Sequence, residues 1–130
     1  MVAAVDHRNG SNGFPAAIPE VISVSSAFQF DFDWMPESGV LAPGIEVLTT
    51  TPGATYAFRS GSSMSTAFVA GVAALLKEKN PQLSSEELSR LIHESALARV
   101  NEVPMVNISR VVNGEANCPA SRSLASGNSL

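Results

Sequence analysis

The order of hydrophobic and polar positions predicts short buried strands followed by two helices. The apolar runs Val2–Val5 and Val21–Val24 are typical of buried parallel strands, and Ile45–Thr50 is expected to form a third one. Thr55–Phe58, beyond a Pro-Gly turn, predicts a further short strand. The segments between these runs are rich in Asn, Gly and Pro, which favour turns and loops.

The first helix is expected to run from Ser63 to Lys79, and it is apolar on nearly every side. A helix of this kind lies buried at the centre of a fold, unlike an amphipathic surface helix. Gly71 in its middle costs about 1 kcal/mol relative to alanine. We therefore expect this glycine to permit close packing. Asn80 and Pro81 end the helix.

A capping box predicts the start of the second helix. Ser84 at the N-cap and Glu87 three residues later can bond reciprocally to each other's backbone amides. Apolar residues then recur at helical spacing and form one stripe, which consists of Leu88, Leu91, Ile92 and Ala96. The helix should lie on the surface with one face buried, and His93 on its polar side should be solvated. Val103–Ile108 is expected to be extended.

The composition is that of one compact α/β domain. Of the 130 residues, 45% are hydrophobic and 15% are charged, which argues against disorder. The net charge of −4 gives little support for nucleic-acid binding. No apolar run reaches the roughly 18 residues of a membrane span, so neither nucleic acid nor a membrane is an expected partner. Residues 114–130 are rich in Ser, Asn, Gly and Ala and are expected to form a disordered tail or linker after a domain of residues 1–113.

Ser63 is the foremost candidate for chemistry. It stands at the predicted N-terminus of the first helix, where backbone amides and the helix dipole can stabilise negative charge. A serine hydroxyl is a weak nucleophile and needs a general base, usually a histidine that an aspartate orients. The simpler interpretation is that Ser62 or Ser63 only caps the helix. For an isolated Ser-Ser pair, capping would be the favoured role.

Residues 60–71, around Ser63, read Ser-Gly-Ser-Ser-Met-Ser-Thr-Ala-Phe-Val-Ala-Gly. They resemble the nucleophile motif of the subtilisin-like serine proteases, or subtilases, which is Ser-Gly-Thr-Ser-Met-Ala-x-Pro-His-Val-Ala-Gly. This resemblance reverses the preference for capping. Residues 14–24, 41–47, 80–84 and 106–112 also resemble family segments, in the same order. The resemblance covers about residues 1–113. It implies the C-terminal portion of a three-layer α/β fold, with parallel strands, a buried helix that carries the nucleophile and a surface helix.

The resemblance also implies a role for individual residues. Ser63 would attack the scissile carbonyl of a peptide. Its backbone amide would bind the oxyanion together with a side chain that follows the first strand, where the family has an asparagine. Counted strictly from Val2–Val5, this position is His7, and with a two-residue insertion it is Asn9. Losing one such donor costs about 3 kcal/mol of transition-state stabilisation. Ala3 and Ala4 would form one wall of the pocket for the residue that precedes the cleaved bond.

The chain lacks two motifs of the family. The catalytic Asp and His of subtilases lie in Asp-x-Gly and His-Gly-x-x-His segments before the part matched here, and neither segment is present. Ala67-Phe68 replace the family's Pro-His, which are not triad members, so this loss should affect packing and leave the chemistry intact. One hypothesis is a serine endopeptidase of which this chain is the C-terminal part, inactive until joined to its N-terminal part. The alternative is a non-catalytic pseudoprotease or binding module.

Partners and cofactors follow from the same resemblance. It implies a peptide or protein substrate and an extracellular or cell-envelope location, although Met1–Val5 does not read as a signal peptide. No cofactor is expected, but a structural calcium or sodium ion can accompany the full enzyme. Asp31 and Asp33 could share a cation, although two carboxylates alone favour a solvated loop. The single cysteine, Cys118, excludes an internal disulfide, and Phe14-Pro15 is a candidate cis peptide.

Overall fold

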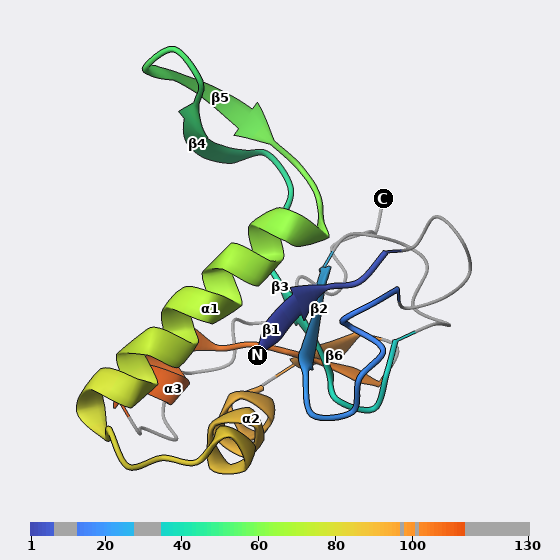
Figure 1. Cartoon of the computed structure of the whole chain (residues 1–130), viewed down its shortest axis with the longest axis vertical. Coiled ribbons are helices and arrows are strands. Elements are labelled where there is room, and N and C mark those ends of the chain that lie inside the picture. Colours follow the sequence, from blue (N-terminus) through green and yellow to red (C-terminus); the bar gives the residue numbers. More distant parts are fainter. Residues whose placement is uncertain (7–12, 28–34, 97, 101, 114–130) are drawn as a thin grey trace, which may run out of the picture.

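The computed structural model describes residues 1–6, 13–27, 35–96, 98–100 and 102–113. Its elements in chain order are β1 (Val2–Ala4), β2 (Ile22–Ser26), β3 (Gly39–Ala42), β4 (Val47–Thr51), β5 (Thr55–Arg59), α1 (Ser62–Lys79), α2 (Ser85–Glu94), β6 (Ala98–Val100), β7 (Val103–Met105) and α3 (Ile108–Asn113). The strands form two separate sheets, and α1 is the longest helix (Figure 1). This arrangement is the α/β class that the sequence predicts.

The main sheet has the strand order β1-β2-β3-β7-β6. β1, β2, β3 and β7 are parallel, and β6 pairs antiparallel to β7 at one edge. At the other edge β1 pairs with β2, so that Val2 lies opposite Ile22 and Ala4 lies opposite Val24. In the described residues no further strand pairs with β1. The carboxyl ends of β1, β2 and β3 therefore lie together at one end of the sheet.

The third parallel strand lies earlier in the chain than predicted. It is β3, whose four residues are all buried. The run predicted as a strand of this sheet, Ile45–Thr50, instead contributes most of β4, which pairs antiparallel with β5 in a two-stranded ribbon. The ribbon projects beyond the N-terminal end of α1 (Figure 1). The burial pattern explains the difference, because β4 alternates between half-buried and exposed positions and so does not suit a strand covered on both faces.

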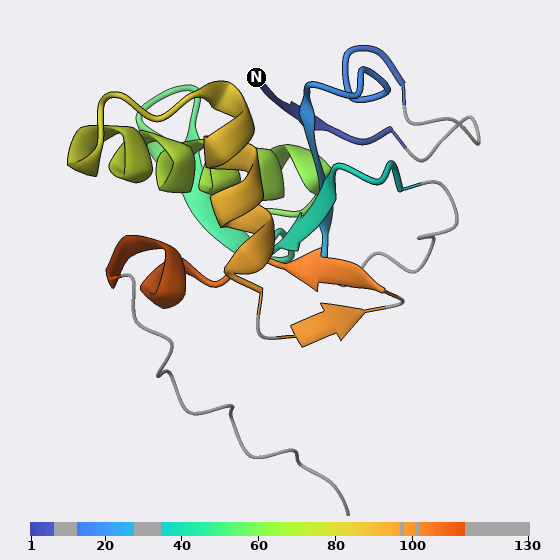
Figure 2. The ribbon, with the colours of Figure 1, turned by 90° about the horizontal axis from the view of Figure 1, so that it is seen from below.

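Both long helices pack on one face of the main sheet. The core between them is formed by alternate side chains of the strands and by one face of each helix, namely Ile22, Val24, Val40, Ala42, Val69, Val72, Ala73, Leu76, Ile92 and Val106. Figure 2 shows α2 running across α1. In the described residues, the opposite face of the sheet packs on the 13–21 segment through Ala3, Val5, Ala16 and Val21. The Phe14-Pro15 peptide bond of this segment, a candidate cis peptide in the sequence, is cis.

α1 is covered on one side only by the described residues. It begins one residue before the predicted start and ends at Lys79, as predicted. Its buried residues recur every three or four positions: Ser65, Val69, Val72, Ala73 and Leu76. The other side is also apolar but exposed, and it includes Ala67, Ala70, Gly71, Ala74 and Leu75. The sequence predicts burial on nearly every side, but the sheet of this chain contacts only one.

The predicted capping box of α2 is confirmed. The Ser84 hydroxyl accepts a hydrogen bond from the Glu87 amide at 3.1 Å, and a Glu87 carboxylate oxygen accepts one from the Ser84 amide at 2.8 Å. The bond from the Ser84 backbone, and then the one from its side chain, lower the pKa of Glu87. Ile92 on the predicted apolar stripe is fully buried. The segment predicted as extended, Val103–Ile108, contains β7 and the first residue of α3.

Candidate active site

Ser63 lies where a nucleophile can use a helix N-terminus. It is the second residue of α1, and its side chain is exposed. Gly61 occupies the N-cap position with φ of 145°, a conformation that residues with a Cβ rarely adopt. No side chain caps this helix, so the capping interpretation of Ser62 and Ser63 is wrong. Within the described part of the chain, the Ser63 hydroxyl makes no hydrogen bond and is accessible to solvent.

The two serines that flank Ser63 anchor the first turn of α1 to strand ends. The Ser62 hydroxyl donates to the carbonyl of Val5, just beyond β1, at 2.9 Å. The Ser65 hydroxyl is fully buried and donates to the carbonyl of Ala42, the last residue of β3, at 3.0 Å. Ser63 is thereby held at the carboxyl ends of the parallel strands, where ligands bind in open α/β sheets.

Gly44 packs directly against this turn. Its carbonyl accepts a hydrogen bond from the Gly61 amide at 2.8 Å. A Cβ at Gly44 would collide with the hydroxyl of Ser65 and lie 2.9 Å from the carbonyl oxygen of Gly61. The Ser60 hydroxyl accepts a further bond, at 2.9 Å, from the amide of Glu46. The close approach of two backbone segments therefore fixes the position of the turn over residues 60–65, which carries the candidate nucleophile and is called the nucleophile turn below.

The helix N-terminus supplies part of an oxyanion site. The amides of Met64 and Ser65 both donate to the Gly61 carbonyl, at 3.0 and 3.5 Å. The Ser63 amide precedes them, among the first N–H groups of the helix, which have no intrahelical acceptor. Such groups can stabilise a developing negative charge. The predicted side-chain donors, His7 and Asn9, lie outside the described residues, so their roles stay predictions.

The predicted pocket wall belongs to β1. Ala3 is buried in the cluster that packs on the 13–21 segment, and Ala4 is half-buried. Successive side chains of a strand point to opposite faces, so these two methyl groups lie on different sides of the sheet. Val5, the next residue, is the one that Ser62 contacts. β1 thus ends beside the nucleophile turn, and the substrate-binding role of Ala3 and Ala4 stays a prediction.

His93 lies far from Ser63 along the strands. Its Nε2 is 3.0 Å from the Ser38 carbonyl oxygen, and it must carry the proton, because a carbonyl only accepts. Ser38 immediately precedes β3, so this contact lies at the amino end of the strand, whereas Ser63 lies at the carboxyl end. His93 is half-buried, which differs from the solvated position that the sequence predicts. The contact with Ser38, in the segment before β3, brings the ring against the rest of the fold.

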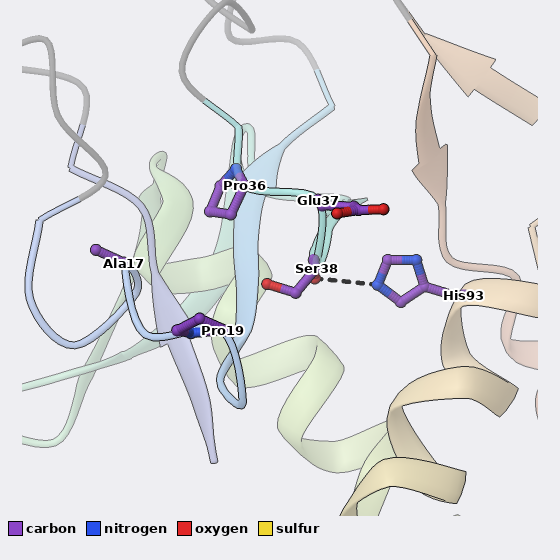
Figure 3. Close-up of a pocket in the computed structure, with 6 residues that line it drawn as sticks. All are labelled: Ala17, Pro19, Pro36, Glu37, Ser38 and His93. Carbon is purple, nitrogen blue, oxygen red and sulfur yellow. Dashed lines mark hydrogen bonds between the residues drawn. The ribbon is translucent and has the colours of Figure 1, made fainter.

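A cavity of about 440 Å³ opens beside His93, and Figure 3 shows the residues that line it: Ala17, Pro19, Pro36, Glu37, Ser38 and His93. The cavity is therefore separate from the nucleophile turn. His93 is the one histidine among the described residues, and its ring is held at this cavity. Among the described residues, no histidine therefore lies beside Ser63.

The described residues hold neither a metal-binding cluster nor a membrane-spanning helix. They contain no group of three or more His, Cys, Asp or Glu side chains able to hold a metal ion. Asp31, Asp33 and Cys118 lie outside them, so the predictions for these residues are not tested. None of the helices described is long and apolar enough to cross a membrane.

Comparison with known proteins identifies the family. The model of the subtilase family matches residues 2–121. The chain belongs to the subtilase family. M-protease from Shouchella clausii (strain KSM-K16) is 43% identical over 101 residues, which are 74% of this chain and 27% of that protein. Subtilisin Savinase from Lederbergia lenta is 46% identical over 101 residues, which are 74% of this chain and 38% of the relative.

Solved structures agree with the predicted subtilisin-like α/β fold. The self-cleaved protease domain of PatA superposes with a TM-score of 0.67 and 28% identity, over 87% of this chain and 49% of that domain. Fervidolysin from Fervidobacterium pennivorans superposes with a TM-score of 0.68 over 91% of this chain and 23% of its own, and at 22% identity it supports the fold alone. This subtilase chain therefore spans less than two fifths of these curated relatives and about half of the PatA domain.

Proposed function

We propose that this subtilase chain carries the nucleophile of a serine endopeptidase, and that the nucleophile is Ser63. The observation that carries the proposal is the exposed hydroxyl of Ser63 at the N-terminus of α1, anchored by its neighbours to the ends of β1 and β3. Family membership supports the reaction class. The substrate is a peptide or protein that lies across the carboxyl ends of the strands, and the enzyme acts outside the cell or in its envelope.

In the reaction, the Ser63 hydroxyl attacks the scissile carbonyl carbon, and its proton passes to a histidine base. The carbonyl oxygen becomes an oxyanion, which the Ser63 amide and the side chain of Asn9 or His7 bind. The histidine then gives its proton to the leaving amine. Water hydrolyses the resulting acyl-enzyme ester and releases Ser63. The hydrogen bonds of Ser62 and Ser65 keep the nucleophile in position throughout.

The base and its orienting aspartate come from a part of the domain that precedes the segment matched here. His93 is held at the opposite end of β3 by its bond to Ser38. The proposal therefore includes that residues 1–130 alone do not hydrolyse peptides. A non-catalytic subtilase scaffold is the remaining alternative, and it predicts that even the full-length protein is inactive.

Peptidase assays on residues 1–130 and on the full-length protein test this function. We expect no turnover by residues 1–130. The full-length protein should cleave a general peptide substrate, and Ser63→Ala should reduce kcat by several orders of magnitude. Ser85→Ala is the matched control, because Ser85 is also an exposed serine in the first turn of a helix. Full activity of Ser63→Ala would exclude Ser63 as nucleophile, and an inactive full-length protein would favour the non-catalytic scaffold.

A further inference from the structure

The β4–β5 ribbon presents three large apolar side chains to solvent. Leu48 is 60% exposed, Tyr56 is 72% exposed and Phe58 is 67% exposed. Leu48 lies directly opposite Phe58, and Tyr56 lies opposite Thr50. Side chains two positions apart in a strand point to the same side, so these four residues form one face of the ribbon, called the ribbon face below. None of the four is charged, and the ribbon face is therefore an apolar surface.

The size of the ribbon face limits what can occupy it. A buried aromatic side chain removes about 150–250 Å² from solvent, so the three apolar side chains here leave roughly 300–400 Å² exposed. Apolar patches of this size on soluble proteins are often functional. Two copies of the chain joined face to face would bury roughly 600–800 Å² through them, whereas a stable interface needs about 1,200 Å² or more. The ribbon face therefore suits a segment of polypeptide better than a second folded protein.

Both strands of the ribbon have an unpaired edge. Among the described strands, β4 and β5 pair only with each other. An extended peptide can add to such an edge through backbone hydrogen bonds, and its alternate side chains then lie on one face of the sheet. The uncharged ribbon face favours apolar side chains at those alternate positions. The occupant that fits is thus an extended segment with apolar side chains.

The base of the ribbon is joined to the nucleophile turn. β5 ends one residue before Ser60, whose hydroxyl accepts the bond from the Glu46 amide at 2.9 Å, and this bond ties together the two ends of the ribbon. From there the ribbon projects beyond the N-terminus of α1 (Figure 1). Along β5, Phe58 lies about 7 Å and Tyr56 about 13 Å from Ser60, at about 3.3 Å per residue. A chain that is bound at Ser63 can therefore reach the ribbon face with residues several positions away from the scissile bond.

We infer that the ribbon face is an exosite, which binds an extended apolar segment of a protein substrate several residues away from the scissile bond. The inference rests on the proposed function, because it requires a substrate chain at Ser63. The exosite adds affinity for the substrate and takes no part in bond cleavage. It favours unfolded proteins with exposed apolar segments over short peptides, which cannot reach from Ser63 to the ribbon face.

Kinetics with a long and a short substrate test the exosite. The triple variant Leu48→Thr, Tyr56→Thr and Phe58→Thr removes the apolar side chains and keeps residues that favour strands. In the full-length protein it should raise KM for β-casein, an unfolded protein, by about 10-fold and leave kcat unchanged. Hydrolysis of N-acetyltyrosine ethyl ester, which is too short to reach the ribbon face, should not change.

The control is Thr49→Val, because Thr49 lies on the opposite face of β4 and valine has a similar shape. This control should keep the wild-type KM for β-casein. An unchanged KM for β-casein in the triple variant would overturn the inference. Equal losses of kcat/KM with β-casein and with the ester would overturn it as well, because they would indicate a disturbed nucleophile turn.

Binding to an inactive variant separates this inference from the proposed function. In full-length protein that carries Ser63→Ala, the anisotropy of fluorescently labelled β-casein should give a Kd that the triple variant raises by about the same factor of 10. If the protein with Ser63 intact hydrolyses neither substrate but this Kd still rises, the proposed function is refuted and the peptide-binding role of the ribbon face stands. If both substrates are hydrolysed and neither KM nor Kd responds, the exosite is refuted and the proposed function stands. A dimer that the triple variant dissociates in sedimentation would place a second copy on the ribbon face and overturn the inference.

Discussion

Replacing Gly44 by alanine should disturb the nucleophile turn strongly. Gly44 is buried, and its carbonyl already accepts the amide of Gly61. The new Cβ would collide with the Ser65 hydroxyl and lie 2.9 Å from the Gly61 carbonyl oxygen, a backbone atom. Ser65 can rotate away only by giving up its bond to Ala42. The turn that holds Ser63 must then shift away from the sheet.

The cost follows from these two contacts. Adding a methyl group to a well-packed interior typically destabilises a protein by about 1–3 kcal/mol. Losing the bond between Ser65 and Ala42 costs about 1 kcal/mol more. We therefore expect Gly44→Ala to lower the free energy of unfolding by about 2–4 kcal/mol, a large part of the roughly 5–15 kcal/mol of a typical domain.

Urea unfolding followed by far-UV circular dichroism measures this change. Gly71→Ala is the matched control, because the same substitution there meets no atom and should be neutral or stabilising by up to about 1 kcal/mol. Adding Ser65→Ala to Gly44→Ala removes one of the two collisions, so the double variant should lose less stability than the sum of the single variants. An unchanged midpoint for Gly44→Ala would refute the close packing of Gly44 under the turn.

Three further predictions concern other contacts. Ile92→Ala should lower the free energy of unfolding by about 2–5 kcal/mol, because Ile92 is fully buried between α2 and the sheet. In urea unfolding, a loss below about 1 kcal/mol would contradict this packing. Ser62→Ala should lower the free energy of unfolding by about 1 kcal/mol, because the hydrogen bond to the Val5 carbonyl is lost. Ser62→Thr keeps the hydroxyl and should retain most of this stability, so equal losses in the two variants would contradict the bond. Because the capping bonds lower the pKa of Glu87, this residue stabilises the fold fully above the ordinary glutamate pKa, and the stabilisation is lost as the pH falls through the lowered pKa. Glu87→Gln should therefore flatten the dependence of the unfolding free energy on acid pH, and an unchanged pH profile would contradict the role of Glu87.

The sequence predicts those elements whose signals are local. The capping box of α2 needs only Ser84 and Glu87, and both bonds form as expected. The predicted helix from Ser63 to Lys79, with its apolar residues between Ala67 and Leu76, likewise matches α1 to within one residue. The family motif places Ser63 at the start of that helix. These features depend on residues within a few positions of one another, so they can be predicted without the rest of the fold.

The errors concern contacts between distant segments. Ile45–Thr50 has the β-branched composition of a core strand, but its place in the separate ribbon depends on which residues cover it. His93 appears solvated from its helix spacing, yet the 35–39 segment brings Ser38 within 3.0 Å of it. The anchoring of Ser62 on Val5 joins residues 57 positions apart and has no local signal. The composition of α1 does predict an apolar surface, and the described residues cover only one side of it.

Active-site labelling tests the identity of the nucleophile most directly. The full-length protein is treated with a fluorophosphonate, which reacts with activated serines of hydrolases, and the modified peptide is identified by mass spectrometry. We predict a single adduct on Ser63, absent from the Ser63→Ala variant and from residues 1–130 alone, which lack the base. An adduct on another serine, or none on the natively folded full-length protein, would contradict the assignment of Ser63 as the catalytic nucleophile.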